Sequence, residues 1–347
     1  MTDTAFKPPT PSKSILQMPK CNLHTHLEGS IRPATYIELA RDQNISIPDE
    51  IEQVEQNLQV SGKERSLVDY LNKIMVNYPV LRSYAALKRT AYEAAEDAFL
   101  DGVIYLEIRA GPVTHSGGNL PVEMCIEAIL EGLKDAEKQL GIINRLIVTG
   151  LRNHNPKHNI LLAEIAKNYQ LQGVVGFDLA GDEANYPADL HKKAFHIIRD
   201  SNLGITVHAG EAAGFENVQY AINVIGASRI GHGVHIIDFS STMELVRDKQ
   251  VLLEICPTSN IHTGAVTKLE LHPVKKFFDF EIPISIGDDD PITSRTRVSN
   301  ELMLLKNVFG FSKEDLKAIQ IDSIKHSFLK EENIKKSLLQ KIYQFNY

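Results

Sequence analysis

Short apolar runs alternate along the chain with longer stretches whose apolar residues recur at helical spacing. The runs are rich in Val, Ile and Leu and end at Gly, Pro or polar residues, as is typical of strands in a parallel sheet covered on both faces. This order of strands and helices predicts an α/β domain. The eight predicted strands are residues 21–26, 103–109, 145–150, 173–179, 204–208, 229–232, 251–255 and 282–287.

Amphipathic stretches with the helical period lie between and after these strands. The interval from His26 to Gly102 is too long for one connection, so extra helices are expected after the first strand, and more at the C-terminus. Eight strands alternating with helices predict a (β/α)8 TIM-type barrel. The predicted helices are residues 33–42, 66–78, 84–101, 121–140, 160–170, 189–202, 218–225, 242–249, 274–279, 301–309, 313–327 and 330–345.

A doubly wound open sheet is the alternative architecture. No Gly-x-Gly-x-x-Gly follows the first predicted strand, so a dinucleotide-binding form of that sheet has no support. Residues 1–17 are polar and contain three prolines, which predicts a loose N-terminal leader; a short arm along the barrel is the other interpretation. Residues 18–347 are predicted to form a single domain.

Composition excludes several classes of protein. The chain of 347 residues is 43% hydrophobic and 23% charged, and no apolar run approaches the roughly 18 residues that span a membrane. The net charge of −7, without a basic block, argues against nucleic acid as a partner. The three cysteines are too far apart for a disulfide framework or a Cys-x-x-Cys metal site, and no secretory signal is visible. A cytoplasmic location is therefore expected.

Histidines and an aspartate end several of the predicted strands. In a barrel these ends surround one mouth, so their side chains should converge. His24 and His26 are two residues apart, which projects both imidazoles from one face of a strand. His208 ends the fifth strand and Asp289 follows the eighth, which weighs against the alternative of an ordinary histidine pair. Three imidazoles and a carboxylate suit one Zn²⁺ ion per chain.

Two further groups are candidates for proton transfer. Glu211 follows His208 by three residues and is expected over the mouth, where burial would raise its pKa; a surface carboxylate is the alternative. His232 lies between two glycines and is compatible with a fourth ligand, a general base or a structural histidine. Its position favours a base or an orienting group beside the metal and its water.

The residues around Asp289 are also acidic. Strand alternation predicts that Asp288 and Asp290 point one way and Asp289 the other, with one aspartate on the metal and one on the substrate. Gly181, in the segment that closes the fourth strand, would let the backbone approach a flat substrate.

Taken together, these segments resemble the adenosine deaminase family of metal-dependent hydrolases. The resemblance covers the chain from about residue 18 to the last helices. The segments that carry it are residues 24–29, 177–183, 207–211, 229–233, 256–260 and 289–291. It implies a zinc barrel enzyme of purine salvage that converts adenosine or 2′-deoxyadenosine, small-molecule adenine nucleosides, to inosine or 2′-deoxyinosine and ammonia.

The resemblance also implies the role of each site residue. Zinc is bound by four residues, Glu211 protonates purine N1, and His232 activates or orients the water. Asp290 holds N7, the Gly181 backbone meets N3, and Glu28 faces the sugar. The implied zinc ligands are His24, His26, His208 and Asp289, of which His26 also contacts the substrate.

Two positions depart from the family pattern. Glu28 stands where Asp usually meets the ribose 5′-hydroxyl, and Asp288 stands where Thr or Ser is usual. Because of these departures, other substrates remain alternatives: adenine, or an N6-methyl or 5′-modified adenine nucleoside or nucleotide. A barrel amidohydrolase acting on an amide or ester and a non-catalytic purine-binding protein are further alternatives. The sequence does not determine an oligomeric state.

Overall fold

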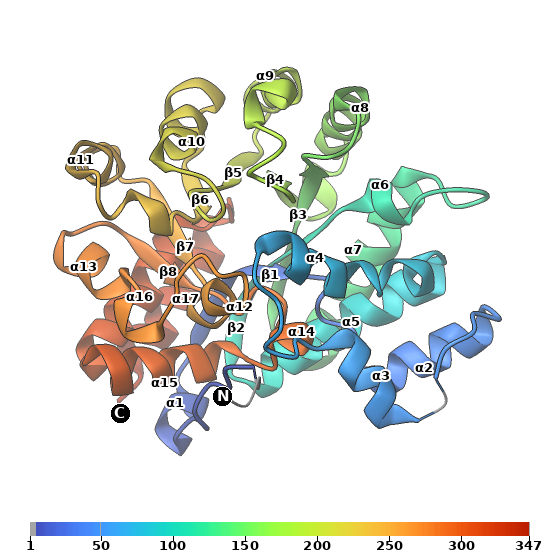
Figure 1. Ribbon diagram of the computed structural model, residues 1–347, viewed down its shortest axis with the longest axis horizontal. Coiled ribbons are helices and arrows are strands. Elements are labelled where there is room, and N and C mark those ends of the chain that lie inside the picture. The colour runs from blue at the N-terminus through green and yellow to red at the C-terminus, as the bar shows by residue number, and fades with distance from the viewer. Residues whose placement is uncertain (1–4, 49, 347) are drawn as a thin grey trace.

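Eight parallel strands form one sheet in sequence order in the computed structural model, which describes residues 5–48 and 50–346. A further parallel bridge joins Thr25 to Asp289, so the chain after the last strand returns to the first and nearly closes the sheet. The predicted (β/α)8 barrel is confirmed (Figure 1). The strands are β1 (Lys20–His26), β2 (Val103–Ala110), β3 (Ile143–Leu151), β4 (Val174–Ala180), β5 (Gly204–Ala209), β6 (Arg229–His232), β7 (Leu252–Ile255) and β8 (Ile284–Ile286).

Helices surround the sheet, and those predicted between the first two strands are present as α2, α4 and α5 (Figure 1). The helices are α1 (Lys13–Gln17), α2 (Pro33–Asp42), α3 (Ile51–Leu58), α4 (Leu67–Met75), α5 (Tyr84–Leu100), α6 (Pro112–His115), α7 (Val122–Leu140), α8 (Pro156–Lys167), α9 (Lys192–Arg199), α10 (Phe215–Tyr220), α11 (Ser240–Asp248), α12 (Pro257–His262), α13 (Val274–Asp279), α14 (Pro291–Ser294), α15 (Val298–Phe309), α16 (Lys313–His326) and α17 (Glu332–Gln344).

Helix starts differ most between the predicted and the observed elements. The predicted helix 160–170 begins earlier, because the Asn155 side chain accepts a hydrogen bond from the Lys157 N–H and Pro156 occupies the first turn. The predicted helix 189–202 is a 3₁₀ turn (Ala188–His191) followed by α9. The short helices α3 and α12 were not predicted, since brief segments carry little periodic signal.

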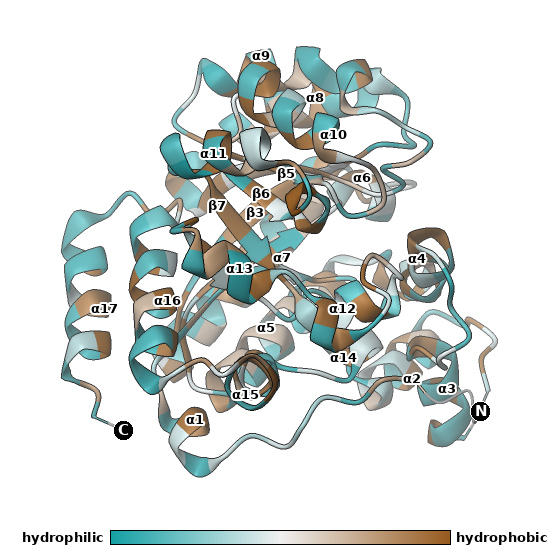
Figure 2. Ribbon diagram, turned by 60° about the vertical axis from the view of Figure 1, so that its left-hand side comes forward, coloured by the Kyte–Doolittle hydropathy of each residue, from teal (hydrophilic) through white to brown (hydrophobic). Residues whose placement is uncertain are grey.

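The hydrophobic core lies between the strands and the helices. Val207, Ile230 and Leu253 are fully buried there, as expected for strands covered by helices. In Figure 2 the strand β7 is mostly hydrophobic, whereas the outer helices α16 and α17 contain both hydrophilic and hydrophobic residues. The barrel interior is instead filled by buried charged side chains, among them Arg109 and Glu254, which form ion pairs.

The N-terminal segment contacts the barrel. Ile15 of α1 is buried in the main core, and the Asn300 side chain donates a hydrogen bond to the carbonyl of Pro9, at 2.8 Å. His262 Nε2 lies 3.0 Å from the carbonyl oxygen of Phe6. From residue 5 onward the contacts favour the short-arm interpretation over the loose leader; residues 1–4 lie outside the described residues. Within the described ranges, no helix is long and apolar enough to cross a membrane.

Candidate active site

The four predicted metal ligands meet at the mouth of the barrel, where the carboxyl ends of β1, β5 and β8 converge. His24 Nε2 lies 3.2 Å from Asp289 Oδ1, and His26 Nε2 lies 3.4 Å from the same oxygen. His26 Nε2 is also 3.2 Å from Nε2 of His208. The nitrogen and oxygen atoms of the four residues therefore face one small space.

Carboxylates from two other strands orient two of these histidines. His24 Nδ1 lies 2.9 Å from Glu254 Oε2, and His208 Nδ1 lies 3.1 Å from Asp178 Oδ1. A hydrogen bond at Nδ1 leaves Nε2 of each ring for a metal ion. The Nε2 atom of His24 is buried and faces the Asp289 carboxylate at 3.2 Å, which is itself a predicted ligand, so both atoms are placed to hold one ion.

The protonation of two of these rings, His26 and His208, also suits a metal site. Burial lowers the pKa of His208, and it lowers the pKa of His26 to about 3, so both rings are neutral at physiological pH, as metal ligands must be. Burial and the charge of Arg109 also lower the pKa of His24. Its hydrogen bonds to Asp289 and Glu254 outweigh them and raise it. A donor set of three imidazoles and one carboxylate fits a divalent ion such as zinc.

His232 lies beside the predicted ligands. One of its ring nitrogens is within 4.8 Å of the ligand atoms of His24, His208 and Asp289, so the geometry leaves the fourth-ligand alternative open. Its Nε2 is 3.5 Å from Glu211 Oε2. Burial lowers the pKa of His232 well below the ordinary value, so the ring is neutral. Its backbone has φ = 65°, a left-handed conformation that is uncommon outside glycine and often marks a functional position.

Glu211 is buried at the mouth, so the surface-carboxylate alternative is wrong. Burial, then the charges of Asp289 and Glu183, raise the pKa of Glu211 well above its ordinary value. Thr263 Oγ1 donates a hydrogen bond to its Oε1 at 3.1 Å, and Asn260 Nδ2 lies 3.4 Å from the same oxygen. The raised pKa favours the protonated side chain, and these two hydrogen bonds fix its position.

Glu183, to which the sequence assigned no role, fixes the loop that carries this acid. Its carboxylate accepts hydrogen bonds from the four consecutive backbone N–H groups of residues 210–213, at 2.7 to 3.1 Å, and from Asn217 Nδ2 at 3.0 Å. Four N–H groups directed at one buried carboxylate form an anion-binding turn. Glu183 therefore connects the loop after β4 to the loop after β5.

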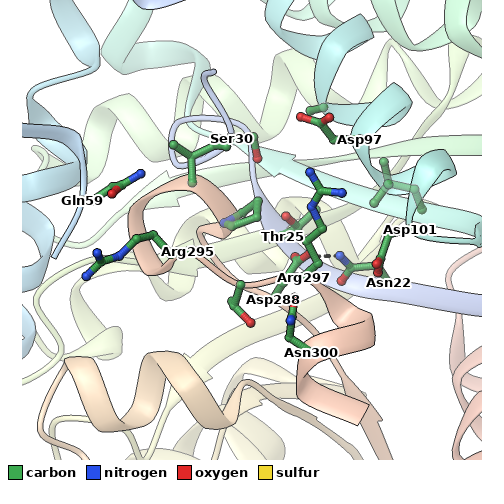
Figure 3. A pocket seen from close by; sticks show the side chains of 16 residues that line it. Asn22, Thr25, Ser30, Gln59, Asp97, Asp101, Asp288, Arg295, Arg297 and Asn300 are labelled. Carbon is green, nitrogen blue, oxygen red and sulfur yellow. Dashed lines mark hydrogen bonds between the residues drawn. The ribbon is translucent and has the colours of Figure 1, made fainter. Parts of the chain in front are cut away.

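The three consecutive aspartates do not alternate as predicted. Asp289 and Asp290 line the active-site pocket, whereas Asp288 lines a separate cavity of about 220 Å³ (Figure 3). There Asp288 accepts a hydrogen bond from Asn22 Nδ2 at 2.7 Å. The alternation fails because Asp289 has φ = 58°, so the strand geometry ends before it. Asp290 packs so closely on Gly29 that a Cβ at Gly29 would overlap its carboxylate.

The active-site pocket has a volume of about 290 Å³ and is covered by α4 from the inserted region. Glu28 lies in its wall, where Oε1 is 2.8 Å from His115 Nε2 and accepts a hydrogen bond from the Gly111 N–H at 2.8 Å. Burial raises the pKa of Glu28, but these hydrogen bonds outweigh it and lower the pKa, so the carboxylate is ionised. Gly181, with φ = 101°, also lines the pocket, as expected.

Three polar residues of the pocket were missed by the sequence interpretation. Thr114 Oγ1, Thr149 Oγ1 and His154 Nδ1 are buried and, within the part of the chain that the structure describes, have no hydrogen-bond partner. Such atoms are candidates for contact with a bound molecule. Thr149 lies near the end of β3, so the rule that located the histidines at strand ends contained a signal for it. The other two lie outside the strands, where that rule gives no signal.

Known proteins resemble the chain over nearly its whole length. A family model described as adenosine deaminase matches residues 19–345. An adenosine deaminase of Clostridium acetobutylicum is 37% identical over 331 residues, which cover 95% of this chain and 98% of that protein. Among solved structures, adenine deaminase from Arthrobacter aurescens superposes with a TM-score of 0.86 at 24% identity, covering 94% of this chain and 98% of that one. N6-mAMP deaminase from Arabidopsis superposes with a TM-score of 0.86 at 26% identity, covering 96% and 100%.

Proposed function

Since the chain belongs to the adenosine deaminase family of metal-dependent hydrolytic deaminases, we propose that its substrates are adenosine and 2′-deoxyadenosine. The products are inosine or 2′-deoxyinosine and ammonia. One observation carries the proposal: Glu211, whose pKa is raised, lines one pocket with His26, His208 and Asp289 and with Glu28, whose pKa is lowered.

Glu211 and Asp290 act on the purine ring as hydrogen-bond donors. Protonation of N1 by Glu211 lets C6 become tetrahedral without negative charge accumulating on the ring. Burial and the charge of Asp289 raise the pKa of Asp290 well above its ordinary value, and its buried Oδ1 has no hydrogen-bond partner among the described residues. A protonated Asp290 donates to N7, which only accepts. The Gly181 N–H donates to N3.

Zinc is the metal we assign to the mouth, and His24, His26, His208 and Asp289 would hold it. When bound, zinc supplies Lewis-acid chemistry that makes water nucleophilic near neutral pH. His232 orients the attacking water, and Glu211 supplies the proton that the ring nitrogen needs. Chelation of the metal should abolish turnover, and added zinc should restore it.

Glu28 and the rest of the pocket wall favour a nucleoside over a nucleotide. Of the described residues that line the pocket, none is Lys or Arg, whereas an ionised carboxylate, Glu28, is present. A 5′-phosphate would meet this negative charge without a compensating cation, whereas a 5′-hydroxyl can donate a hydrogen bond to it. His26 lines the same pocket and would contact the substrate beside Glu28.

A comparison of substrates tests the proposal. The zinc-loaded protein is assayed with adenosine, 2′-deoxyadenosine, adenine, AMP and N6-methyl-AMP, by the absorbance change that follows loss of the amino group. We expect kcat/KM for adenosine to exceed that for AMP by about 100-fold, as for an unpaired charge worth ~3 kcal/mol. A preference for adenine, AMP or N6-methyl-AMP would contradict it. Binding without turnover would favour a purine-binding protein.

We also propose that residues 18–347 act as one catalytic domain and that the protein works in the cytoplasm. The three cysteines, Cys21, Cys125 and Cys256, are free and buried, which agrees with a reducing compartment.

A further inference from the structure

A line of hydrogen bonds runs from the backbone of α13 to His232 through two buried side chains. The Val274 N–H donates to His272 Nδ1 at 3.2 Å. His272 Nε2 is 3.1 Å from Asn260 Oδ1, and Asn260 Nδ2 is 3.1 Å from His232 Nδ1. No sequence motif assigned His272 to the site. The structure connects it to the mouth.

The direction of each hydrogen bond follows from what each atom can do. A backbone N–H can only donate, so His272 Nδ1 accepts. Burial lowers the pKa of His272 to about 3, so the ring is neutral and carries its one proton on Nε2. That nitrogen donates to Asn260 Oδ1. The amide of Asn260 is thereby oriented with its Nδ2 toward His232.

The same reasoning determines which nitrogen of His232 carries the proton. An amide nitrogen only donates, so His232 Nδ1 accepts, and the neutral ring has its proton on Nε2. We infer that His272 and Asn260 are positioning residues that hold His232 as the Nε2–H tautomer. The consequence for catalysis rests on the proposed function. There, the Nε2–H of His232 donates a hydrogen bond that orients the water, and Nε2 is neither a base nor a metal ligand.

Without His272, the Asn260 amide would be free to turn. Asn260 Oδ1 would then face His232 Nδ1 and require a proton there, which would leave Nε2 without one. The turn would also remove the approach of Asn260 Nδ2 to Glu211 Oε1, now 3.4 Å. One outer histidine thus controls the hydrogen bonding of both groups that we assign to catalysis.

The tautomer is measured directly by NMR. The zinc-loaded, full-length protein is labelled with ¹⁵N-histidine, and the His232 signals are assigned from their loss in His232→Gln. We expect an unprotonated Nδ1 and a protonated Nε2 in the wild type. Asn260→Asp, which offers only acceptors, should move the proton to Nδ1. His272→Leu should give a mixture, whereas His272→Gln, whose amide can donate to Asn260, should keep the wild-type pattern.

Kinetics provide the second measurement. For His272→Leu we expect kcat on adenosine to fall about 10- to 100-fold, as for loss of an outer-sphere partner, with KM changed less than about threefold and zinc content unchanged. His272→Gln should recover kcat to within about threefold. The control is His191, a second buried histidine paired with an asparagine, Asn159, at 2.9 Å. His191→Leu should leave the His232 tautomer and kcat unchanged.

The inference is overturned by a wild-type His232 that carries its proton on Nδ1, or by an unchanged tautomer in His272→Leu. Where His272→Leu does not fold, the tautomer in Asn260→Asp and His272→Gln decides the question in the same way. The NMR result does not depend on turnover. An Nε2–H tautomer in a protein that deaminates no aminopurine would refute the proposed function and leave the positioning role standing.

Discussion

Two layers of buried charge lie inside the barrel, and they differ in how the charges are neutralised. In the paired layer, formed by Glu107, Arg109, Arg229 and Glu254, every side chain is fully buried and in an ion pair. Arg229 bridges Glu107 and Glu254 at 2.6 Å each, and Arg109 meets Glu254 at 2.6 Å. Each acid there has a guanidinium partner.

The mouth cluster, formed by Glu211, His232, Asp289 and Asp290, has no ion pair with an arginine of the described residues. Burial raises the pKa of Glu211 and Asp290. In the paired layer burial also disfavours ionised Glu254, but Arg109 and Arg229 outweigh it and lower the pKa of Glu254 well below its ordinary value. Equally buried carboxylates thus have pKa values shifted in opposite directions, and the raised values at Glu211 and Asp290 favour protons held at the mouth.

The largest expected effect is on chemistry at the mouth. Glu211→Gln should lower kcat by about 10³- to 10⁴-fold, or about 4–5.5 kcal/mol, because the amide cannot supply the proton. Zinc content, measured by atomic emission, should not change. Loss of zinc would show that Glu211 is a metal ligand and that its assignment as the acid is wrong.

Arg229→Met tests the paired layer. It leaves Glu107 buried without a guanidinium partner and leaves Glu254 with Arg109 alone, so the free energy of unfolding should fall by about 3–5 kcal/mol. Guanidinium chloride denaturation measures it. The matched control is Arg145→Met, whose partners Glu137 and Glu331 are partly exposed, with an expected loss of at most about 1 kcal/mol. If the two variants lost the same free energy of unfolding, the buried ion pairs of the paired layer would not stabilise the fold more than surface ion pairs do.

Replacing Glu211 at the mouth by a neutral residue should change the free energy of unfolding in the direction opposite to Arg229→Met. Because the folded state already favours protonated Glu211, the Glu211→Gln protein should unfold with a free energy equal to the wild type or about 0.5–2 kcal/mol higher. The same denaturation curve, at pH 8, measures it. Destabilisation as large as that of Arg229→Met would mean that Glu211 is a structural charge.

The pH profile follows from the same raised pKa. Glu211 acts protonated, so kcat/KM should be retained below its raised pKa and lost as the pH rises through it. A profile of kcat/KM on adenosine shows this as a descending alkaline limb. The residual activity of Glu211→Gln should lack that limb. An identical limb in the variant would assign it to another group.

The smallest expected effect on kcat/KM is for Asp288, which lies outside the active-site pocket. Asp288 faces its own cavity (Figure 3), so Asp288→Ser should change kcat/KM by less than about threefold. Asp290→Asn should lower it more, because the amide would present a different hydrogen-bond pattern to N7. Steady-state kinetics on adenosine measure both variants. A larger loss for Asp288→Ser than for Asp290→Asn would place the wrong aspartate in the pocket.

Local pattern was enough for much of the fold and for part of the site. The eight apolar runs located every strand, and the two-residue spacing of His24 and His26 predicted their shared face. The pattern failed where the backbone leaves regular geometry. At Asp289 a left-handed φ reverses the expected direction of the next side chain. Glu183 was overlooked because its donors are distant in sequence: four come from the loop after β5 and one from α10.

The sequence by itself therefore determined the order of strands and helices and the residues that end at the mouth, because side-chain periodicity and strand ends are local properties of the chain. Only the tertiary structure decided which protons those residues hold. Glu254 and Asp178 meet the histidines, and His272 reaches His232 through Asn260, only after the barrel closes. Burial together with the nearest charges then sets each protonation state. The paired layer contains two arginines that neutralise its carboxylates, whereas the mouth cluster contains none, so equally buried acids differ in the charges beside them.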